Sequence, residues 1–231
     1  MENTINKFVR NCERICDFET AELPKEYYYS SLVFCILDAV FSMGVRYTST
    51  EKVVERYANK YGLNRYTFEK SDTEHTIKDF ITNINSVNDI YKFTVEILKN
   101  RQRTSTKNGI LKAQACYDVA NVFIKHGINT LNDFRNLSRE QQVVLDKDIL
   151  NIKGQGSGIM LKYLYMLAGS EDICKPDRHI RRFVEPILGE NSTDEEIQKL
   201  FIYACNEMKK DFPRITVRLL DNKIWDYQKS I

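Results

Sequence analysis

The spacing of apolar residues is the feature that most restricts how this chain can fold. Across residues 5–18 apolar side chains such as Phe8, Cys12 and Ile15 recur with a period near 3.6, which places them on one face of an α-helix. Residues 30–44 are apolar on nearly every side, and a helix of that kind belongs in the middle of a domain. No segment shows the sustained alternation that indicates a β-strand. The pattern therefore predicts an all-α fold.

Glycine and capping signals divide the rest of the sequence into further helices. Gly62, Gly127 and Gly169 each follow a helical pattern, as a C-terminal glycine stop does. Ser138 is followed three residues later by Gln141, which is the spacing of a capping box. The further helices that we predict span residues 49–61, 73–84, 86–99, 109–126, a short stretch after Thr130, 138–150, 157–168, 178–188, 193–211 and 214–228.

Composition excludes several classes of protein. With 42% apolar and 29% charged residues the sequence is typical of a soluble globular chain, and no apolar run approaches the roughly 18 to 20 residues that a membrane span needs. Residues 1–4 lack the basic start of a secretory signal. The six cysteines form no C-x-x-C pair and the three histidines lie far apart, so we expect no metal, iron–sulfur cluster or other cofactor. The expected location is cytoplasmic and associated with the nucleoid.

A glycine-rich turn lies between two of the predicted helices. Its sequence is Ile152-Lys153-Gly154-Gln155-Gly156, and glycines two apart allow a tight turn that brings backbone N–H groups to the surface. The next helix begins at the same point with free N–H groups and the positive end of its dipole. A DNA phosphate fits that geometry. An ordinary helix–helix turn would have the same pattern, so the hairpin alone leaves both interpretations open.

An acidic residue follows nineteen residues beyond Gly158. Asp177 comes directly after Pro176 and at a predicted helix start, where it could be a plain N-cap that contributes about 1 kcal/mol. It could also be a catalytic carboxylate that faces the same groove as the hairpin. The neighbouring residues Arg178 and Arg181 are suited to contact phosphates.

Taken together, the segment 150–183 resembles the signature of the helix-hairpin-helix/Gly-Pro-Asp DNA glycosylases, the endonuclease III superfamily. In that family a Leu-Pro-Gly-Val-Gly hairpin precedes a helix, a short loop and Val-Asp-Thr-His. Here the corresponding positions are 151–156 and 176–179, and the resemblance spans about residues 30–185. It implies two helical lobes with a central groove for a flipped nucleotide. We expect a first lobe of residues 31–168, ending in the hairpin, and a second of 1–30 with 169–231, carrying Asp177.

Two departures from the family pattern shape the expected activity. Lyase members carry a lysine two residues after the second glycine of the hairpin, whereas this chain has Gly158, preceded by Ser157, so no Schiff-base nucleophile stands there. Lys153, Lys162 and Lys175 lie near in sequence but not at that position. The C-terminal four-cysteine cluster is also absent, since Cys205 is the only cysteine in the last 50 residues. The resemblance therefore implies a monofunctional glycosylase without an iron–sulfur cluster.

In such an enzyme Asp177 would remain ionised, stabilise the sugar cation as the base departs and activate the attacking water. The target base would be flipped out of the stack. Candidate pocket residues are Asp38, stranded in an apolar helix, and the aromatic residues Tyr27, Tyr28, Tyr29, Phe41 and Trp225. Each could equally belong to the core, and Asp38 could be a buried hydrogen-bonding partner.

The remaining candidate DNA contacts are basic and polar. They comprise the hairpin residues Ile152, Lys153, Gly154, Gln155, Gly156, Ser157 and Gly158, and the basic segment Lys99, Arg101, Arg103, Lys107 and Lys112. The net charge is only +2, so binding must come from such local patches, although a solvent-exposed loop without a binding role would have the same composition.

We expect a monomer bound to double-stranded DNA. The alternatives are a non-catalytic DNA- or RNA-binding hairpin protein and a helical interaction protein whose hairpin is only a turn.

Overall fold

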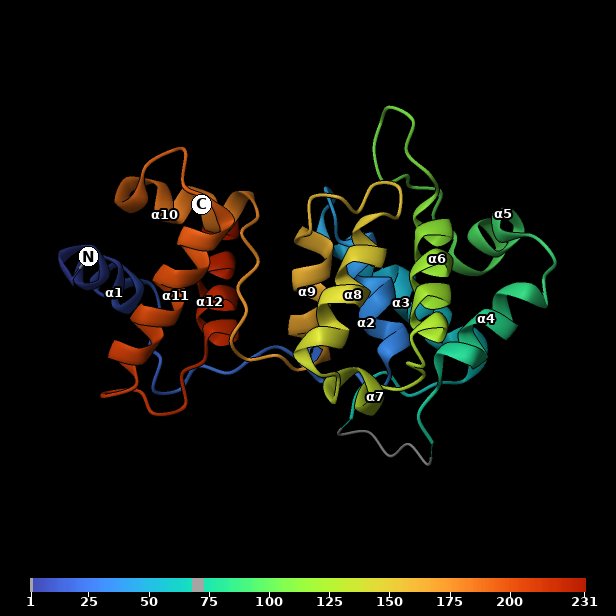
Figure 1. Ribbon diagram of the computed structural model, residues 1–231, viewed down its shortest axis with the longest axis horizontal. Coiled ribbons are helices and arrows are strands. Elements are labelled where there is room, and N and C mark those ends of the chain that lie inside the picture. Colours follow the sequence, from blue (N-terminus) through green and yellow to red (C-terminus); the bar gives the residue numbers. More distant parts are fainter. Residues whose placement is uncertain (1, 68–72) are drawn as a thin grey trace. The chain divides into compact units, whose positions relative to one another are not determined.

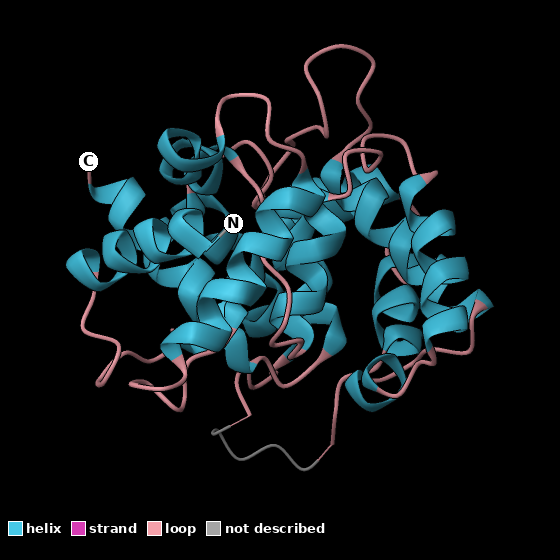
Figure 2. Ribbon diagram, turned by 60° about the vertical axis from the view of Figure 1, so that its left-hand side comes forward, coloured by secondary structure: helices cyan, strands magenta, loops and turns pink. Residues whose placement is uncertain are grey.

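The computed structural model describes residues 2–67 and 73–231 and forms two compact units. Unit 1 combines Met1–Pro24 with Ser170–Ile231, and unit 2 is Lys25–Gly169. Every regular element in the described ranges is helical and no strand forms there, so the predicted all-α class is confirmed (Figures 1 and 2). The chain crosses between the units after Pro24 and after Gly169, whereas the sequence placed these boundaries after residues 30 and 168. Among the described helices none combines the length and the apolarity required to cross a bilayer.

Unit 2 is organised around helix α2 (Leu32–Phe41). All ten of its residues are buried, and Figure 1 shows it between α9 (Ile159–Ala168) and the pair α3 (Tyr47–Tyr61) and α6 (Lys112–Lys125), all of which it contacts. Each fully buried Leu, Ile, Val or Phe side chain contributes about 1.5–3 kcal/mol. The apolar run thus forms the central helix of unit 2, as its composition predicts.

Several helices begin or end at the capping residues that the sequence predicts. Gly62 and Gly169 end α3 and α9 in left-handed conformations, with φ of +65° and +116°. Helix α8 (Arg139–Leu150) begins with the predicted capping box, in which Ser138 Oγ accepts from Gln141 N and Gln141 Oε1 accepts from Ser138 N. The short helix after Thr130 is α7 (Leu131–Arg135).

Several predicted helices of unit 2 differ in extent from the structure, and two of them show the physical reason. The segment 86–99 forms only a short helix α5 (Ile90–Lys92), capped by Asp89, and continues as a π-helix, Phe93–Leu98, which Lys99 ends with φ of +49°. Helix α6 begins three residues later than predicted because Leu111 pairs with Arg103 in an isolated antiparallel bridge. The segment before α6 is therefore a loop folded back on itself rather than a helical turn.

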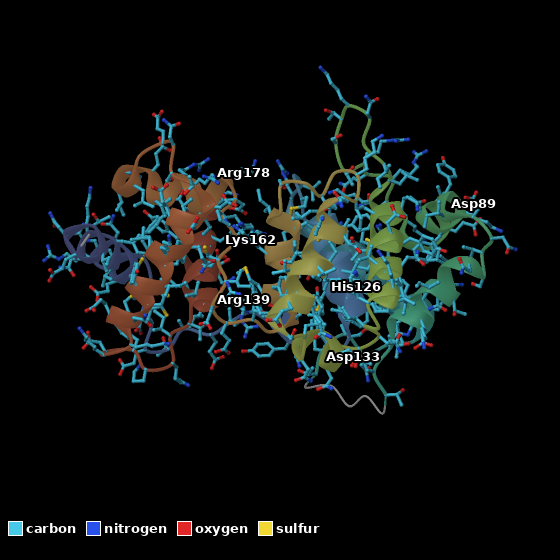
Figure 3. All side chains as sticks on the ribbon, viewed as in Figure 1. Asp89, His126, Asp133, Arg139, Lys162 and Arg178 are labelled. Carbon is cyan, nitrogen blue, oxygen red and sulfur yellow. The ribbon has the colours of Figure 1, made fainter. Side chains whose placement is uncertain are left out.

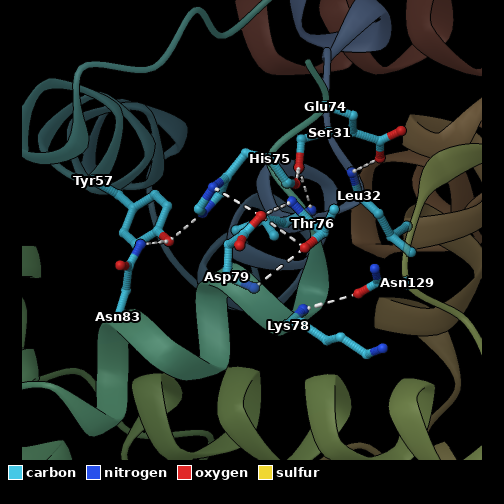
Figure 4. A network of polar contacts seen from close by, with 11 residues as sticks. Ser31, Leu32, Tyr57, Glu74, His75, Thr76, Lys78, Asp79, Asn83 and Asn129 are labelled. Carbon is cyan, nitrogen blue, oxygen red and sulfur yellow. Dashed lines mark hydrogen bonds and ion pairs between the residues drawn. The ribbon is translucent and has the colours of Figure 1, made fainter.

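A polar network ties together helix ends of unit 2 (Figure 4). Glu74 Oε1 accepts from the backbone N of Leu131 at 2.7 Å and of Leu32 at 3.4 Å, so one carboxylate caps both α7 and α2. Burial raises the pKa of Glu74 above its ordinary value. The Tyr57 hydroxyl lies 2.7 Å from His75 Nε2, just before α4 (Ile77–Asn85) begins. The two contacts of Glu74 satisfy backbone N–H groups that helix termini leave unpaired.

The described residues of unit 1 form four helices, α1 (Glu2–Ile15), α10 (Arg178–Leu188), α11 (Asp194–Met208) and α12 (Val217–Ser230). Helix α1 contacts the other three. At the centre of their core Phe8 lies 5.8 Å from Phe183 and 5.2 Å from Phe201, measured between ring centroids. The first helix of the chain therefore folds with the last three.

Candidate nucleic-acid interface and catalytic carboxylate

The segment between α8 and α9 is a compact hairpin in unit 2. Three backbone hydrogen bonds build it as successive turns, from Ile152 N to Ile149 O (3.0 Å), Gln155 N to Ile152 O (2.9 Å) and Gly158 N to Gln155 O (3.1 Å). Gly154 and Gly158 adopt positive φ angles of +90° and +73°, which glycine accepts at little cost.

The hairpin presents a group of unpaired backbone amides. Helix α9 has Gly158 as its N-cap and therefore no capping side chain. In the part of the chain that the structure describes, no acceptor pairs with the N–H groups of Gly156, Ser157, Ile159, Met160 and Leu161. Gly156, Ser157 and the neighbouring Lys153 are exposed, and Figure 3 shows Lys162 on α9. This is the arrangement of a helix N-terminus that binds an anion.

The basic loop before α6 packs on the same hairpin. A Cβ added at Gly154 would lie 2.4 Å from both Cβ and Oγ1 of Thr104. The loop keeps its shape through bonds from Thr104 N to Ile110 O (2.9 Å) and from Arg103 to Gly109 O (2.6 Å). It extends outward from unit 2 beside the hairpin in Figure 1. The structure thus brings the hairpin together with the exposed residues Arg101 and Arg103.

We expect Gly154→Ala to destabilise the protein more than Gly62→Ala. Both positions have positive φ, which costs an L-residue about 1–2 kcal/mol, but a Cβ at Gly62 meets no atom within 4 Å, whereas one at Gly154 meets Thr104. The added overlap should raise the loss to about 2–4 kcal/mol. Urea unfolding measures both values. Equal losses for the two variants would mean that the hairpin does not rest on this loop.

Lys112 is not available as a DNA contact, contrary to the sequence-based expectation. Its side chain is buried, and Nζ donates to Phe41 O at 2.8 Å and to Met43 O at 2.7 Å. Burial lowers the pKa of Lys112 to about 8. The lysine therefore satisfies carbonyl groups at the C-terminal end of α2, where a positive charge also complements the helix dipole.

Asp177 is the N-cap of α10 in unit 1. Its Oδ1 atom accepts from His179 N at 2.9 Å and from Ile180 N at 3.3 Å. The other oxygen, Oδ2, lies 3.9 Å from Lys175 Nζ, and the side chain is 19% exposed. One oxygen thus fixes the carboxylate in place, while the group as a whole retains some access to solvent.

The loop that carries Asp177 is fixed by contacts that the sequence analysis did not identify. Lys175 N donates to Asp221 Oδ1 at 2.8 Å, Cys174 N to Gln198 Oε1 at 3.0 Å, and Asp177 N to Lys175 O at 2.6 Å. Asp221 lies on α12 and is only 2% exposed. Burial raises its pKa to about 8, although the Lys175 amide and the charge of Lys175 oppose the rise.

The two arginines beside Asp177 differ in their contacts. Arg178 is exposed at the start of α10 (Figure 3), with Nε 3.3 Å from His179 Nε2. Arg181 forms an ion pair with Asp194 and donates to Ser192 O at 2.8 Å. Arg181 therefore joins α10 to the start of α11, and Arg178 is the more accessible of the two for a phosphate.

The candidate pocket residues divide between the units. In unit 2, Asp38 is wholly buried and its Oδ2 accepts from the hydroxyls of Tyr29 (3.0 Å) and Tyr47 (2.9 Å). Burial and the charge of Asp38 raise the pKa of both tyrosines. Phe41 is also fully buried, Tyr27 is 7% exposed and Tyr28 is 43% exposed. The sequence analysis named no partner for Asp38, and Tyr47 was not among its candidate pocket residues.

Trp225 belongs to unit 1. Its ring packs edge-on against His179, with centroids 5.6 Å apart, and Lys229 Nζ lies 4.7 Å from its centroid. It is thus close in the fold to the residue that Asp177 caps. No group of three or more His, Cys, Asp or Glu side chains within the described residues is arranged to hold a metal ion.

Comparison with known families places the chain in a family. A family model described as a domain of unknown function (DUF8548) matches residues 6–229, which is nearly the whole chain and both of its units. No curated protein and no solved structure matches the chain.

Proposed function

We propose that this chain, which belongs to the DUF8548 family, is a DNA glycosylase that hydrolyses the N-glycosidic bond of a damaged or modified base. The observation that carries the proposal is the hairpin of unit 2, where the unpaired amides of Gly156, Ser157, Ile159, Met160 and Leu161 have the arrangement of a helix start suited to bind an anion. The resemblance of residues 150–183 to the helix-hairpin-helix glycosylases supplies the identity of the anion, a DNA phosphate.

Binding in this proposal combines the hairpin with the neighbouring basic loop. The amides hold one phosphate, and the exposed side chains of Lys153, Arg101 and Arg103 provide charge for the adjoining backbone. Such contacts fix the register of a protein on DNA and make the affinity fall steeply with salt. The bound form is one copy of the chain on double-stranded DNA with one base flipped out of the stack, and its location in the cell is the nucleoid.

The chemical step in this proposal belongs to Asp177. As the C1′–N bond breaks, positive charge develops on the deoxyribose, and a carboxylate beside C1′ stabilises it. The base leaves with the electron pair of the broken bond and takes a proton from solvent. Asp177 accepts a proton from the water that adds to C1′ and then returns it to solvent. The cap that Oδ1 makes with His179 N and Ile180 N holds the carboxylate in one orientation, which catalysis requires.

A panel of duplexes, each with a single lesion, tests the proposal. The panel covers uracil, alkylated purines, oxidised bases and mismatches, and the released base is measured directly by chromatography, separately from strand nicking. We expect release from at least one lesion class and none from an undamaged duplex. A protein that binds these duplexes and releases no base from any of them would contradict the glycosylase proposal.

A non-catalytic DNA- or RNA-binding protein is the second candidate. It is favoured by the capping role of Asp177, since capping alone would explain an aspartate at that position. It is also favoured by Gly158, which replaces the lysine of the lyase members. The effect of replacing Asp177, described in the Discussion, separates the two candidates.

A further inference from the structure

Unit 2 contains an open pocket to which neither the hairpin nor Asp177 contributes. It has a volume of about 450 Å³ and lies where the end of α4 and the start of α5 meet α6, three helices that Figure 1 shows on one side of unit 2. Small-molecule sites typically measure about 300–1,000 Å³. We infer that this pocket binds a free nucleoside whose base carries an amino group, such as adenosine. The inference goes beyond the proposed function and does not rest on it.

The charge of the pocket favours a ligand without phosphate groups. Among the described residues that line it, Asp89 is the only charged one, and the other polar groups are three side-chain amides and the hydroxyl of Tyr117. Asp89 Oδ1 accepts from the backbone N of Tyr91 at 2.8 Å, which fixes the carboxylate in place. A fixed negative charge repels a phosphate. The pocket is therefore suited to a nucleoside rather than a nucleotide.

Hydrogen bonds to neighbouring side chains orient two of the amides. The Tyr117 hydroxyl donates to Asn85 Oδ1 at 3.1 Å, so Asn85 offers its NH₂ group to a ligand. Gln114 Nε2 donates to Asp118 Oδ1 at 2.8 Å, so Gln114 offers its oxygen. Gln114 and Tyr117 are three residues apart on α6 and share one face of the helix. The pocket thus presents a donor from Asn85 near an acceptor from Gln114.

An amino-bearing base has the complementary groups. In adenine the exocyclic amine donates and the adjacent ring nitrogen accepts, and one asparagine or glutamine amide recognises adenine by this pair of bonds. In the pocket the amine would donate to Gln114 Oε1 and to the second carboxylate oxygen of Asp89, and the ring nitrogen would accept from Asn85 Nδ2. The Tyr117 ring and the apolar side chain of Ile84 supply surface for the faces of the base.

Calorimetric titration of the full chain with adenosine tests the inference. We expect saturable binding at one site per chain. Purine riboside, in which hydrogen replaces the amine, should bind more weakly by on the order of 10- to 100-fold, and adenosine 5′-monophosphate should bind more weakly than adenosine because of Asp89. Absence of saturable binding up to the solubility limit of adenosine would overturn the inference. Purine riboside or the monophosphate binding as tightly as adenosine would overturn it too.

The variant Asn85→Asp assigns the binding to this pocket. It keeps an oxygen that accepts from the Tyr117 hydroxyl but replaces the NH₂ donor by a second acceptor, so adenosine affinity should fall by on the order of 10- to 100-fold. Asn132→Asp is the matched control, since Asn132 is an exposed asparagine of the same unit outside the pocket, and it should bind like the wild type.

Side-chain amide NMR of the wild-type protein gives a second measurement that does not depend on a variant. The NH₂ signals of Asn85 and Gln114 should shift as adenosine is added, and that of Asn132 should stay unchanged. Adenosine binding that leaves the Asn85 and Gln114 signals unmoved, or that Asn85→Asp does not weaken, would overturn the inference. Base release from the lesion panel is measured without adenosine, so the proposed function stands or fails separately.

Discussion

Asp177→Asn should lower the single-turnover rate of base release by about 10²- to 10⁴-fold, the range that a general base contributes, while DNA affinity stays nearly unchanged. The asparagine side chain keeps a carbonyl oxygen that can accept from His179 N and Ile180 N, and asparagine caps helices about as well as aspartate. The fold should therefore persist. What the variant lacks is the negative charge beside C1′ and the ability to accept a proton from water.

Base release and gel-shift affinity are measured on the same lesion duplex to separate chemistry from binding. Asp211→Asn is the matched control, because Asp211 is an exposed carboxylate of the same unit and its replacement should leave the rate as it is. If Asp177→Asn released the base at the wild-type rate, the carboxylate would be only a helix cap, and the second candidate function would be favoured.

Asp221→Asn should remove a pH dependence of stability that amounts to at most about 6 kcal/mol. Burial raises the pKa of Asp221 from 3.8 to about 8 in the folded protein. The folded state thus holds a proton that the unfolded chain releases near pH 4. The stabilisation of the folded state by this proton is fully present below that pH, and it is lost as the pH rises through 8. Asparagine is neutral throughout and keeps an oxygen for the Lys175 amide.

Urea unfolding at pH 5, 7 and 9 measures this difference. We expect the free energy of unfolding of Asp221→Asn, relative to that of the wild type, to increase as the pH rises. Most of this increase should be complete by pH 9. Lys175 and Asp177 face residue 221 in both proteins, so the two proteins differ only in the carboxyl group that is replaced. Parallel curves for the two proteins would mean that Asp221 is not protonated in the folded state.

The features that the sequence predicted depend on local signals. The apolar run of α2, the glycine ends of α3 and α9 and the capping box at Ser138 each involve residues within about three helical turns of one another. The hairpin and the helix start at Asp177 belong to the same class. A short sequence window contains all the residues that make each of these features, so pattern analysis finds them.

The features that the sequence did not predict depend on distant residues. Lys112 is buried because carbonyls 69 and 71 positions earlier accept from its amine. Asp221 holds the backbone of Lys175 across 46 positions, and nothing in the neighbourhood of either residue indicates the pairing. The packing of the loop before α6 on the hairpin likewise brings Thr104 against Gly154, which lies 50 positions later in the sequence. Tertiary packing decides such contacts.

The central claim is that the amides at the start of α9 bind a DNA phosphate, and amide NMR during titration with a short duplex tests it most directly. We predict that the largest shifts occur at Gly156, Ser157, Ile159 and Met160 and diminish as salt is added. Amides at the start of α8, where Ser138 caps the helix, serve as the internal control and should stay unchanged. DNA binding that shifts signals elsewhere but leaves the hairpin amides unmoved would contradict the claim.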